Sequence, residues 1–141
     1  MEGLNVKGEG KKLPKPNNII TIPIKYDSEF FRWWCVILRP FVPLTNKEID
    51  VIASFLHQRY ELSKSILDSS ILDTMVMSDE VKNKVIKESN ITKQHFYVIM
   101  SNLRKSGVIV NDVINPRLIP NIRHEDGGVF QLLTLFKYKA A

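Results

Sequence analysis

The stretch IKESNITKQHFYVI, residues 86–99, decides the fold of this 141-residue chain. Its apolar and turn positions are Ile86, Asn90, Ile91, Phe96 and Ile99. Asn is the best non-glycine residue for a left-handed backbone, so the chain can turn sharply at Asn90. Two helices that cross at a steep angle must share one apolar cluster at their crossing, and residues at this spacing can form it. The stretch therefore predicts a helix-turn-helix.

The ends of these two helices are also marked in the sequence. Ser78 is an N-cap for the first helix, and two acidic residues follow it in the first turn, where the helix dipole favours them. Thr92 caps the second helix, which is expected to run to Lys105 and to stop at Gly107. Ile86 is larger than the Ala that usually opens the pattern in DNA-binding versions. The crossing of the helices is therefore expected to be wider or shifted.

Upstream of this motif, three further helices are expected. Thr45, with Glu48 three residues later, forms a capping box that opens a long helix. Its apolar residues recur at helical spacing and predict that one face lies against a core: Ile49, Ile52, Ala53, Leu56 and Tyr60. Shorter helices are expected over residues 29–38, with Ser28 as N-cap, and over residues 71–77. The pair Trp33 and Trp34 is expected to pack in the core.

Downstream, the pattern changes to β-branched runs separated by turn residues. Residues 108–114, centred on Asn111-Asp112, predict a tight hairpin. A second hairpin is expected from strands at 118–122 and 129–138, and its second strand is apolar on both faces and expected to be well covered. Helices followed by hairpins predict an α+β, mainly helical fold: a winged helix-turn-helix with C-terminal β-hairpins and an extended N-terminal arm.

The arm comprises residues 1–18 and is rich in Gly, Lys, Pro and Asn, with almost nothing to bury. Its lysines are Lys7, Lys11, Lys12 and Lys15. Residues 19–24 predict a strand, and Pro23 restricts it to a sheet edge or to a contact with another chain because proline has no N–H for the ladder. Residues 19–141 are expected to form a single winged-helix-like domain.

The net charge of +5 is unevenly distributed along the chain. Residues 1–26 hold five basic and two acidic residues, a net charge of +3. Residues 27–80 hold five basic and nine acidic residues (−4), and residues 81–141 hold ten basic and four acidic residues (+6). This polarity suits a protein that binds nucleic acid through one end. It equally suits one that stacks its basic face on the acidic face of another copy.

Several classes of protein are disfavoured by the sequence. The first twenty residues contain no apolar signal-peptide core, and the apolar stretch 30–42 is interrupted by Arg and Pro and is too short to span a bilayer, so neither secretion nor a membrane protein is expected. Cys35 lies in an apolar run and is expected to be a buried, inert thiol. The histidines His57, His95 and His124 are far apart, so we expect no metal site, no cofactor and no catalysis.

From residue 44 to residue 120 the chain resembles winged helix-turn-helix proteins in general. The resemblance is carried by LTNKEID (44–50), NITKQHFY (90–97) and LRKSGVI (103–109). More weakly, the whole sequence resembles a small conserved protein of crAss-like phages of gut Bacteroides, through its Lys/Ile/Asn-rich composition, FFRWW (30–34) and NPRLIP (115–120). The second resemblance implies a virion or phage-regulatory role and a location in the virion or the host cytoplasm.

Two functions are consistent with these features. The first is a structural subunit of a larger assembly, such as a ring in a phage tail or connector, which forms homo-oligomers, contacts other protein subunits and docks through its arm. Residues 96–100 are five consecutive apolar residues, more than one core face can bury, and this favours a partner on that helix.

The alternative is binding of double-stranded DNA, as a phage transcriptional regulator or replication accessory protein. The second helix would enter the major groove, and the arm lysines would follow the backbone or the minor groove. Gln94 would read adenine, while Lys93, Arg104 and Lys105 would contact phosphate. The residues expected to contact DNA or a protein partner are Lys93, Gln94, Tyr97, Val98, Ser101, Arg104 and Lys105, with Thr92 beside them.

Overall fold

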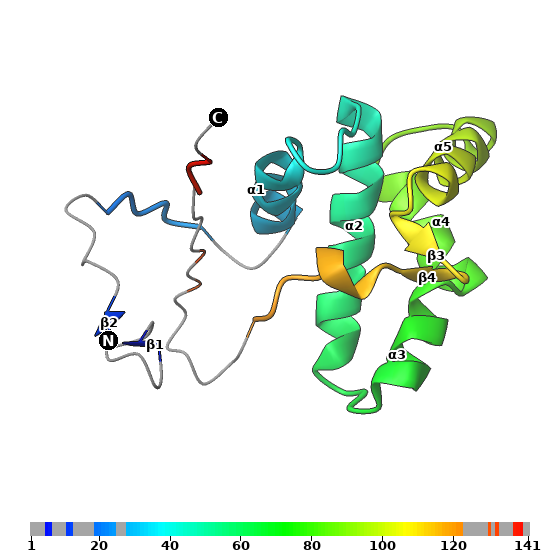
Figure 1. Cartoon of the computed structure of the whole chain (residues 1–141). Helices are drawn as coiled ribbons and strands as arrows, with labels where there is room; N and C mark the ends of the chain where they lie inside the picture. The colour runs from blue at the N-terminus through cyan, green and yellow to red at the C-terminus, as the bar shows by residue number, and fades with distance from the viewer. Residues whose placement is uncertain are drawn as a thin grey trace.

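Five α-helices and two short hairpins make up the part of the chain that the structure describes. The computed structural model describes residues 5–6, 11–12, 19–24, 28–122, 130, 132 and 137–139. The elements, in chain order, are β1 (Asn5–Val6), β2 (Lys11–Lys12), α1 (Ser28–Leu38), α2 (Asn46–Ser63), α3 (Ser69–Val76), α4 (Asp79–Glu88), α5 (Lys93–Lys105), β3 (Ile109–Val110), β4 (Val113–Ile114) and the 3-10 turn η1 (Pro116–Leu118) (Figure 1). The fold is therefore mainly helical, with β3 and β4 forming a small antiparallel sheet after the last helix.

Helix α2 lies at the centre of the fold, between α1 on one side and α3, α4 and α5 on the other (Figure 1). The sequence predicted one buried face, but every residue from Val51 to Leu56 is buried, as is Ile49. The prediction of a single core face was wrong because four helices pack around α2, so tertiary neighbours cover positions that periodicity alone assigns to solvent. Asp50 stays half-exposed and pairs with Arg32 of α1.

The predicted caps at Thr45 and Ser78 are present, whereas the one predicted at Ser28 is not. The Thr45 hydroxyl accepts a hydrogen bond from the Glu48 backbone N–H (3.2 Å), and the Thr45 N–H donates to the Glu48 carboxylate (3.0 Å), which completes the capping box. Ser78 caps α4 by accepting from the Val81 N–H. Helix α3 begins two residues earlier than predicted, because the Asp68 carboxylate accepts from the first free N–H groups of that helix. Helix α1 includes Ser28, the residue predicted as its cap.

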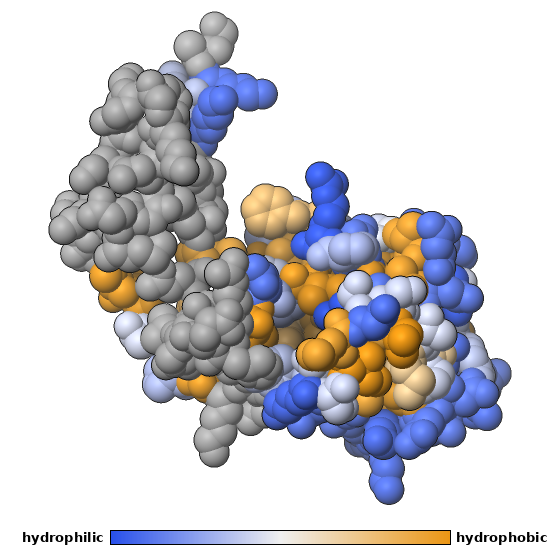
Figure 2. All heavy atoms as spheres, turned by 90° about the horizontal axis from the view of Figure 1, so that it is seen from below, coloured by the Kyte–Doolittle hydropathy of each residue, from blue (hydrophilic) through white to orange (hydrophobic). Residues whose placement is uncertain are grey.

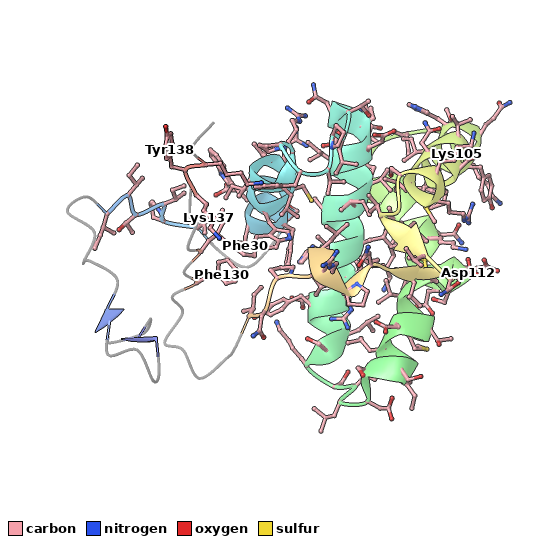
Figure 3. The ribbon with its side chains drawn as sticks, in the orientation of Figure 1. Phe30, Lys105, Asp112, Phe130, Lys137 and Tyr138 are labelled. Carbon is pink, nitrogen blue, oxygen red and sulfur yellow. The ribbon has the colours of Figure 1, made fainter. Side chains whose placement is uncertain are left out.

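Helix α1 contacts α2, η1 and the chain that follows η1. The Trp34 indole N–H donates to the Leu118 carbonyl (2.7 Å), a contact between residues 84 positions apart. Phe130 packs edge-to-face on Phe30 (5.2 Å between ring centroids) and on Trp34 (5.7 Å) (Figure 3). Trp34 is buried as predicted, whereas Trp33 is 46% exposed, so only one of the two tryptophans belongs to the core.

Two predicted β elements are absent from the described residues. Residues 19–24 form no strand, because Pro23 cannot donate to a ladder and no described strand lies beside them. In place of the first strand of the second hairpin, the chain forms η1 and then irregular structure to residue 122. The Asn115 side chain accepts from the Arg117 N–H and favours a helical turn there, and Pro120 removes a further ladder donor.

The second strand of that hairpin was predicted at 129–138. Its described residues, 130, 132 and 137–138, are not in a strand, and Leu132 is exposed rather than well covered; the remaining residues of that segment lie outside the described ones. None of the described helices is long and apolar enough to cross a membrane.

Candidate interaction surfaces

The turn between α4 and α5 has the backbone that the sequence predicted. Asn90 is left-handed (φ 54°). Its N–H donates to the Lys87 carbonyl (3.2 Å), and the Ile91 N–H donates back to the Ile86 carbonyl (3.4 Å). This pair of bonds is the Schellman motif, which ends a helix by satisfying its last free carbonyls. Thr92 then starts α5 by accepting from the His95 N–H (3.1 Å).

Helix α5 also ends in a Schellman motif. Gly107 is left-handed (φ 81°), and its N–H donates to the Arg104 carbonyl (3.2 Å). The Val108 N–H donates to the Leu103 carbonyl (3.0 Å). The Thr92 side-chain cap fixes the start of α5, and these backbone hydrogen bonds fix its end, at 93 and 105 as predicted.

The apolar cluster under these helices differs in one position from the prediction. Val85 is fully buried on α4, whereas Ile86 is only partly buried, as is Ile91. Ile86 and Ile91 both pack against the core at its margin, and Val85, which the prediction did not include, is buried completely. Phe96 and Ile99 are buried as predicted, and the Phe96 ring lies 6.1 Å from Phe55 of α2.

Helix α5 has one buried and one outward face. Phe96, Ile99, Met100 and Leu103 are buried against the core. All seven residues predicted to contact DNA or a partner lie on the other side: Lys93, Gln94, Tyr97, Val98, Arg104 and Lys105 are exposed, and Ser101 is half-buried. Tyr97 (54% exposed) and Val98 (55%) are the two apolar residues of α5 that are not buried in the core. Within the described residues, Lys93, Arg104 and Lys105 take part in no ion pair.

The hairpin β3–β4 extends directly from the end of α5. Ile109 pairs with Ile114 and Val110 with Val113. The connecting residues Asn111 (φ 53°) and Asp112 (φ 61°) are both left-handed, as a type I′ turn requires, and this confirms the predicted tight hairpin (Figure 3). The Asn115 side chain donates to the Gly107 carbonyl (3.0 Å) and so ties the base of the hairpin to the end of α5.

The outer residues of α5 and the hairpin form one surface. We name it the α5 surface: Lys93, Gln94, Tyr97, Val98, Ser101, Arg104, Lys105 and the exposed Val110 of β3. It combines an apolar centre with three cationic side chains.

Two further apolar surfaces were missed by sequence reasoning. On α3, Ile71 and Met75 are exposed and lie one helical turn apart, so they form one stripe, and Leu67, just before the N-cap Asp68, is exposed as well. Figure 2 views the molecule from below, the end that carries α3, and shows hydrophobic side chains gathered there with hydrophilic ones around them. The four-residue spacing of Ile71 and Met75 could have indicated this stripe, but from the sequence residues 71–77 were interpreted only as a short helix. The second surface lies on and after α1 and consists of Trp33, Val36, Ile37 and Phe41.

The arm lysines are only partly described. Lys11 and Lys12 form β2, which pairs antiparallel with β1 in the register Asn5 to Lys12 and Val6 to Lys11. Lys7 and Lys15 lie outside the described residues.

Two features inside the fold could be taken for reactive sites, a buried cysteine and a groove beside α2. Burial raises the pKa of the Cys35 thiol to about 12, which makes it an inert core residue as predicted. A groove of about 330 Å³ lies between α2 and the chain around residues 116–122 and contains Arg59, whose guanidinium pairs with Asp73 (3.1 Å). Among the described residues, no group of three or more His, Cys, Asp or Glu is placed to hold a metal ion.

Comparisons of the chain with protein-family models, with curated proteins and with solved structures found no match.

Proposed function

We propose that this protein is a non-enzymatic structural subunit that assembles with copies of itself and with other protein subunits. One observation carries the proposal: three separate apolar surfaces are exposed, on α1, on α3 and on α5 with its hairpin. Monomeric soluble proteins rarely expose contiguous apolar patches unless a partner covers them, because apolar area left in water forgoes roughly 25 cal/mol per Å². Three such surfaces on a small fold imply several neighbours.

The order of elements supports a winged-helix architecture for this subunit. Helices α4 and α5 meet at a tight turn, and a hairpin with a two-residue loop follows α5 at once. Such a fold presents its second helix outward. In this proposal that helix meets protein.

The wider setting of the subunit follows from the weaker resemblance noted above. A likeness to a small protein of crAss-like phages supports a place in a bacteriophage virion, as a ring in the tail or connector. We propose that the arm, residues 1–18 with Lys7, Lys11, Lys12 and Lys15, provides a further contact by docking on a neighbouring subunit. The protein would then occur in the virion and, before assembly, in the host cytoplasm.

The test is the mass of the protein in solution. Light scattering over a range of protein concentrations should give a mass that rises above that of one chain, because assembly is concentration-dependent. Deleting residues 1–18 should reduce assembly and leave the circular dichroism spectrum of the folded chain unchanged. A mass of one chain at every concentration would overturn the proposal.

Binding of double-stranded DNA is the second candidate, and the α5 surface favours it. Residues 89–111 contain three cationic residues and no acidic one, so phosphate could approach α5 without repulsion. Neutralising one phosphate contact should lower the slope of log K against log salt by about one. Lys93→Ala and Arg104→Ala should each do so, whereas Lys64→Ala, at the far end of α2 and paired with Glu61, should not. An absence of binding to duplex DNA at low salt would exclude this function.

A further inference from the structure

Two neighbouring parts of the chain carry opposite net charges, with Lys64 and Lys82 flanking the first and Glu88 and Asp112 flanking the second. Residues 65–81, which include α3, contain four acidic residues, Asp68, Asp73, Asp79 and Glu80, and no Lys or Arg. Residues 89–111, which include α5 and β3, contain Lys93, Arg104 and Lys105 and no Asp or Glu. The first part thus carries a charge of −4 and the second of +3, with histidine neutral.

The α3 stripe has an acidic border. Asp68 precedes the helix, and Asp79 and Glu80 follow it within four or five residues of Met75; all three acidic residues are exposed. Asp73 is half-buried and engaged with Arg59, so its charge is already compensated. Glu80 lies 4.0 Å from Lys84, and such an exposed pair contributes little, so Glu80 remains available to a partner. We name this set the α3 surface: Leu67, Asp68, Ile71, Met75, Asp79 and Glu80.

The α5 surface has the complementary composition. Its exposed apolar residues, Tyr97, Val98 and Val110, are accompanied by cations near both ends of the helix, Lys93 at the first residue and Arg104 with Lys105 at the last. An apolar centre with a charged border is the usual anatomy of a protein interface, because the centre excludes water while the border sets partner and orientation.

The two helices lie at different ends of the fold, and the hairpin that carries Val110 lies between them, with β4 against α3. Helix α5 lies at the upper end of the fold and α3 at the lower end (Figure 1). The α5 surface of one chain therefore cannot reach its own α3 surface, but it can reach that of a second chain. A contact between two α3 surfaces, or between two α5 surfaces, would place like charges together and is therefore unfavourable.

From this arrangement we infer that the α5 surface of one copy docks on the α3 surface of the next copy, head to tail. The inference rests on the proposed function, and it names the interface that the assembly uses. A contact between two different surfaces leaves one of each free, so further copies add until the rotation closes a ring or a filament continues. Because opposite charges form the border, assembly should weaken as salt is added.

The test uses two variants, each of which blocks one surface. Ile71→Lys places a cation in the apolar centre of the α3 surface, where it would face the three cations of the α5 surface. A second variant, Tyr97→Ser with Val98→Ser, removes the apolar centre of the α5 surface without adding charge. All three positions are exposed, so both variants should fold, which circular dichroism and thermal melting check. Ser28→Lys, which adds the same charge at an exposed position outside the three apolar surfaces, is the control.

Each blocked variant alone should assemble with a dissociation constant raised by roughly tenfold or more, because like charges or a lost apolar centre now meet at the contact. The control should assemble as the unmodified chain does. Mixed together, the two blocked variants should form a one-to-one dimer that grows no further, because only one intact α5 surface and one intact α3 surface remain. Light scattering and native mass spectrometry measure this product.

The failures are distinguishable. If the unmodified chain is always a monomer, the assembly function and this interface are both overturned. If it assembles and the blocked variants assemble equally well, the interface is wrong and the proposed function stands. If each variant is impaired but their mixture gives no one-to-one dimer, the contact is not head to tail, and the inference is overturned.

Discussion

Truncating Phe96 to Ala tests the packing on which the outward face of α5 depends. Phe96 is 1% exposed and is among the largest fully buried side chains, with its ring 6.1 Å from Phe55 of the central helix. The loss combines the transfer free energy of the ring with the cavity left between α5 and α2, about 3–5 kcal/mol in total. For a chain of this size, each kcal/mol lowers Tm by about 4 °C, so Phe96→Ala should lower Tm by roughly 12–20 °C.

The neighbouring residue provides the matched control. Tyr97→Ala removes an aromatic side chain from the same helix, at a position that is 54% exposed, and should change the free energy of unfolding by no more than about 0.5 kcal/mol. Urea unfolding followed by circular dichroism measures both variants, and Phe96→Leu, which keeps most of the volume, should lie between them. If Phe96→Ala costs less than about 1 kcal/mol, or if Tyr97→Ala costs as much, the two faces of α5 are assigned in reverse.

Three further predictions concern local features. Thr45→Ala should lower the free energy of unfolding by about 0.5–2 kcal/mol in urea titrations, because it removes half of the capping box, and no change would mean that the box does not form in solution. Gly107→Ala should cost about 1–2 kcal/mol from the left-handed backbone alone, since an added Cβ would meet no atom within 4 Å; a larger loss would indicate a clash that the structure does not contain. The Cys35 thiol, with its pKa raised by burial to about 12, should resist a thiol reagent at pH 8 in the folded chain and react in denaturant. Because the folded pKa lies above the unfolded value of 9.0, the stability due to the neutral thiol is complete below pH 9 and is lost as the pH rises toward 12, so Cys35→Ala should flatten that part of the stability profile.

The features predicted correctly from the sequence depend on residues a few positions apart. Thr45 with Glu48, Asn90 in the turn, and Asn111-Asp112 in the hairpin each specify a backbone conformation through their own side chains. The outward face of α5 was predicted correctly for a related reason: once Phe96 and Ile99 are assigned to the core, helical geometry fixes the remaining positions.

The errors concern features that depend on distant parts of the chain. Burial around the whole of α2 requires knowledge of four packed helices, which its own periodicity does not contain. The spacing rule included Ile86 but missed the buried Val85, which is apolar and adjacent to it. The segment after Ile114 was predicted as a strand from its apolar residues, although Pro116 and Pro120 interrupt any ladder.

Of the two surfaces in the proposed contact, one could be predicted from local sequence and the other could not. The α5 surface could be predicted because it is the remainder of an amphipathic helix. The α3 surface could not, because a short helix with apolar residues on two sides gives no indication of which side the core covers: Leu72 and Val76 are buried, and Ile71 and Met75 are exposed.

The way in which the ends of α5 are fixed has a consequence for how the α5 surface can change by mutation. Neither the Asn90 turn nor the Gly107 stop uses an outward side chain of the helix, and the four buried residues of α5 hold its position. Substitutions at the six exposed outward positions should therefore cost the fold little stability. If the proposed assembly function holds, homologues could acquire new docking specificities at these sites, and the helix offers a scaffold onto which a foreign epitope can be transplanted.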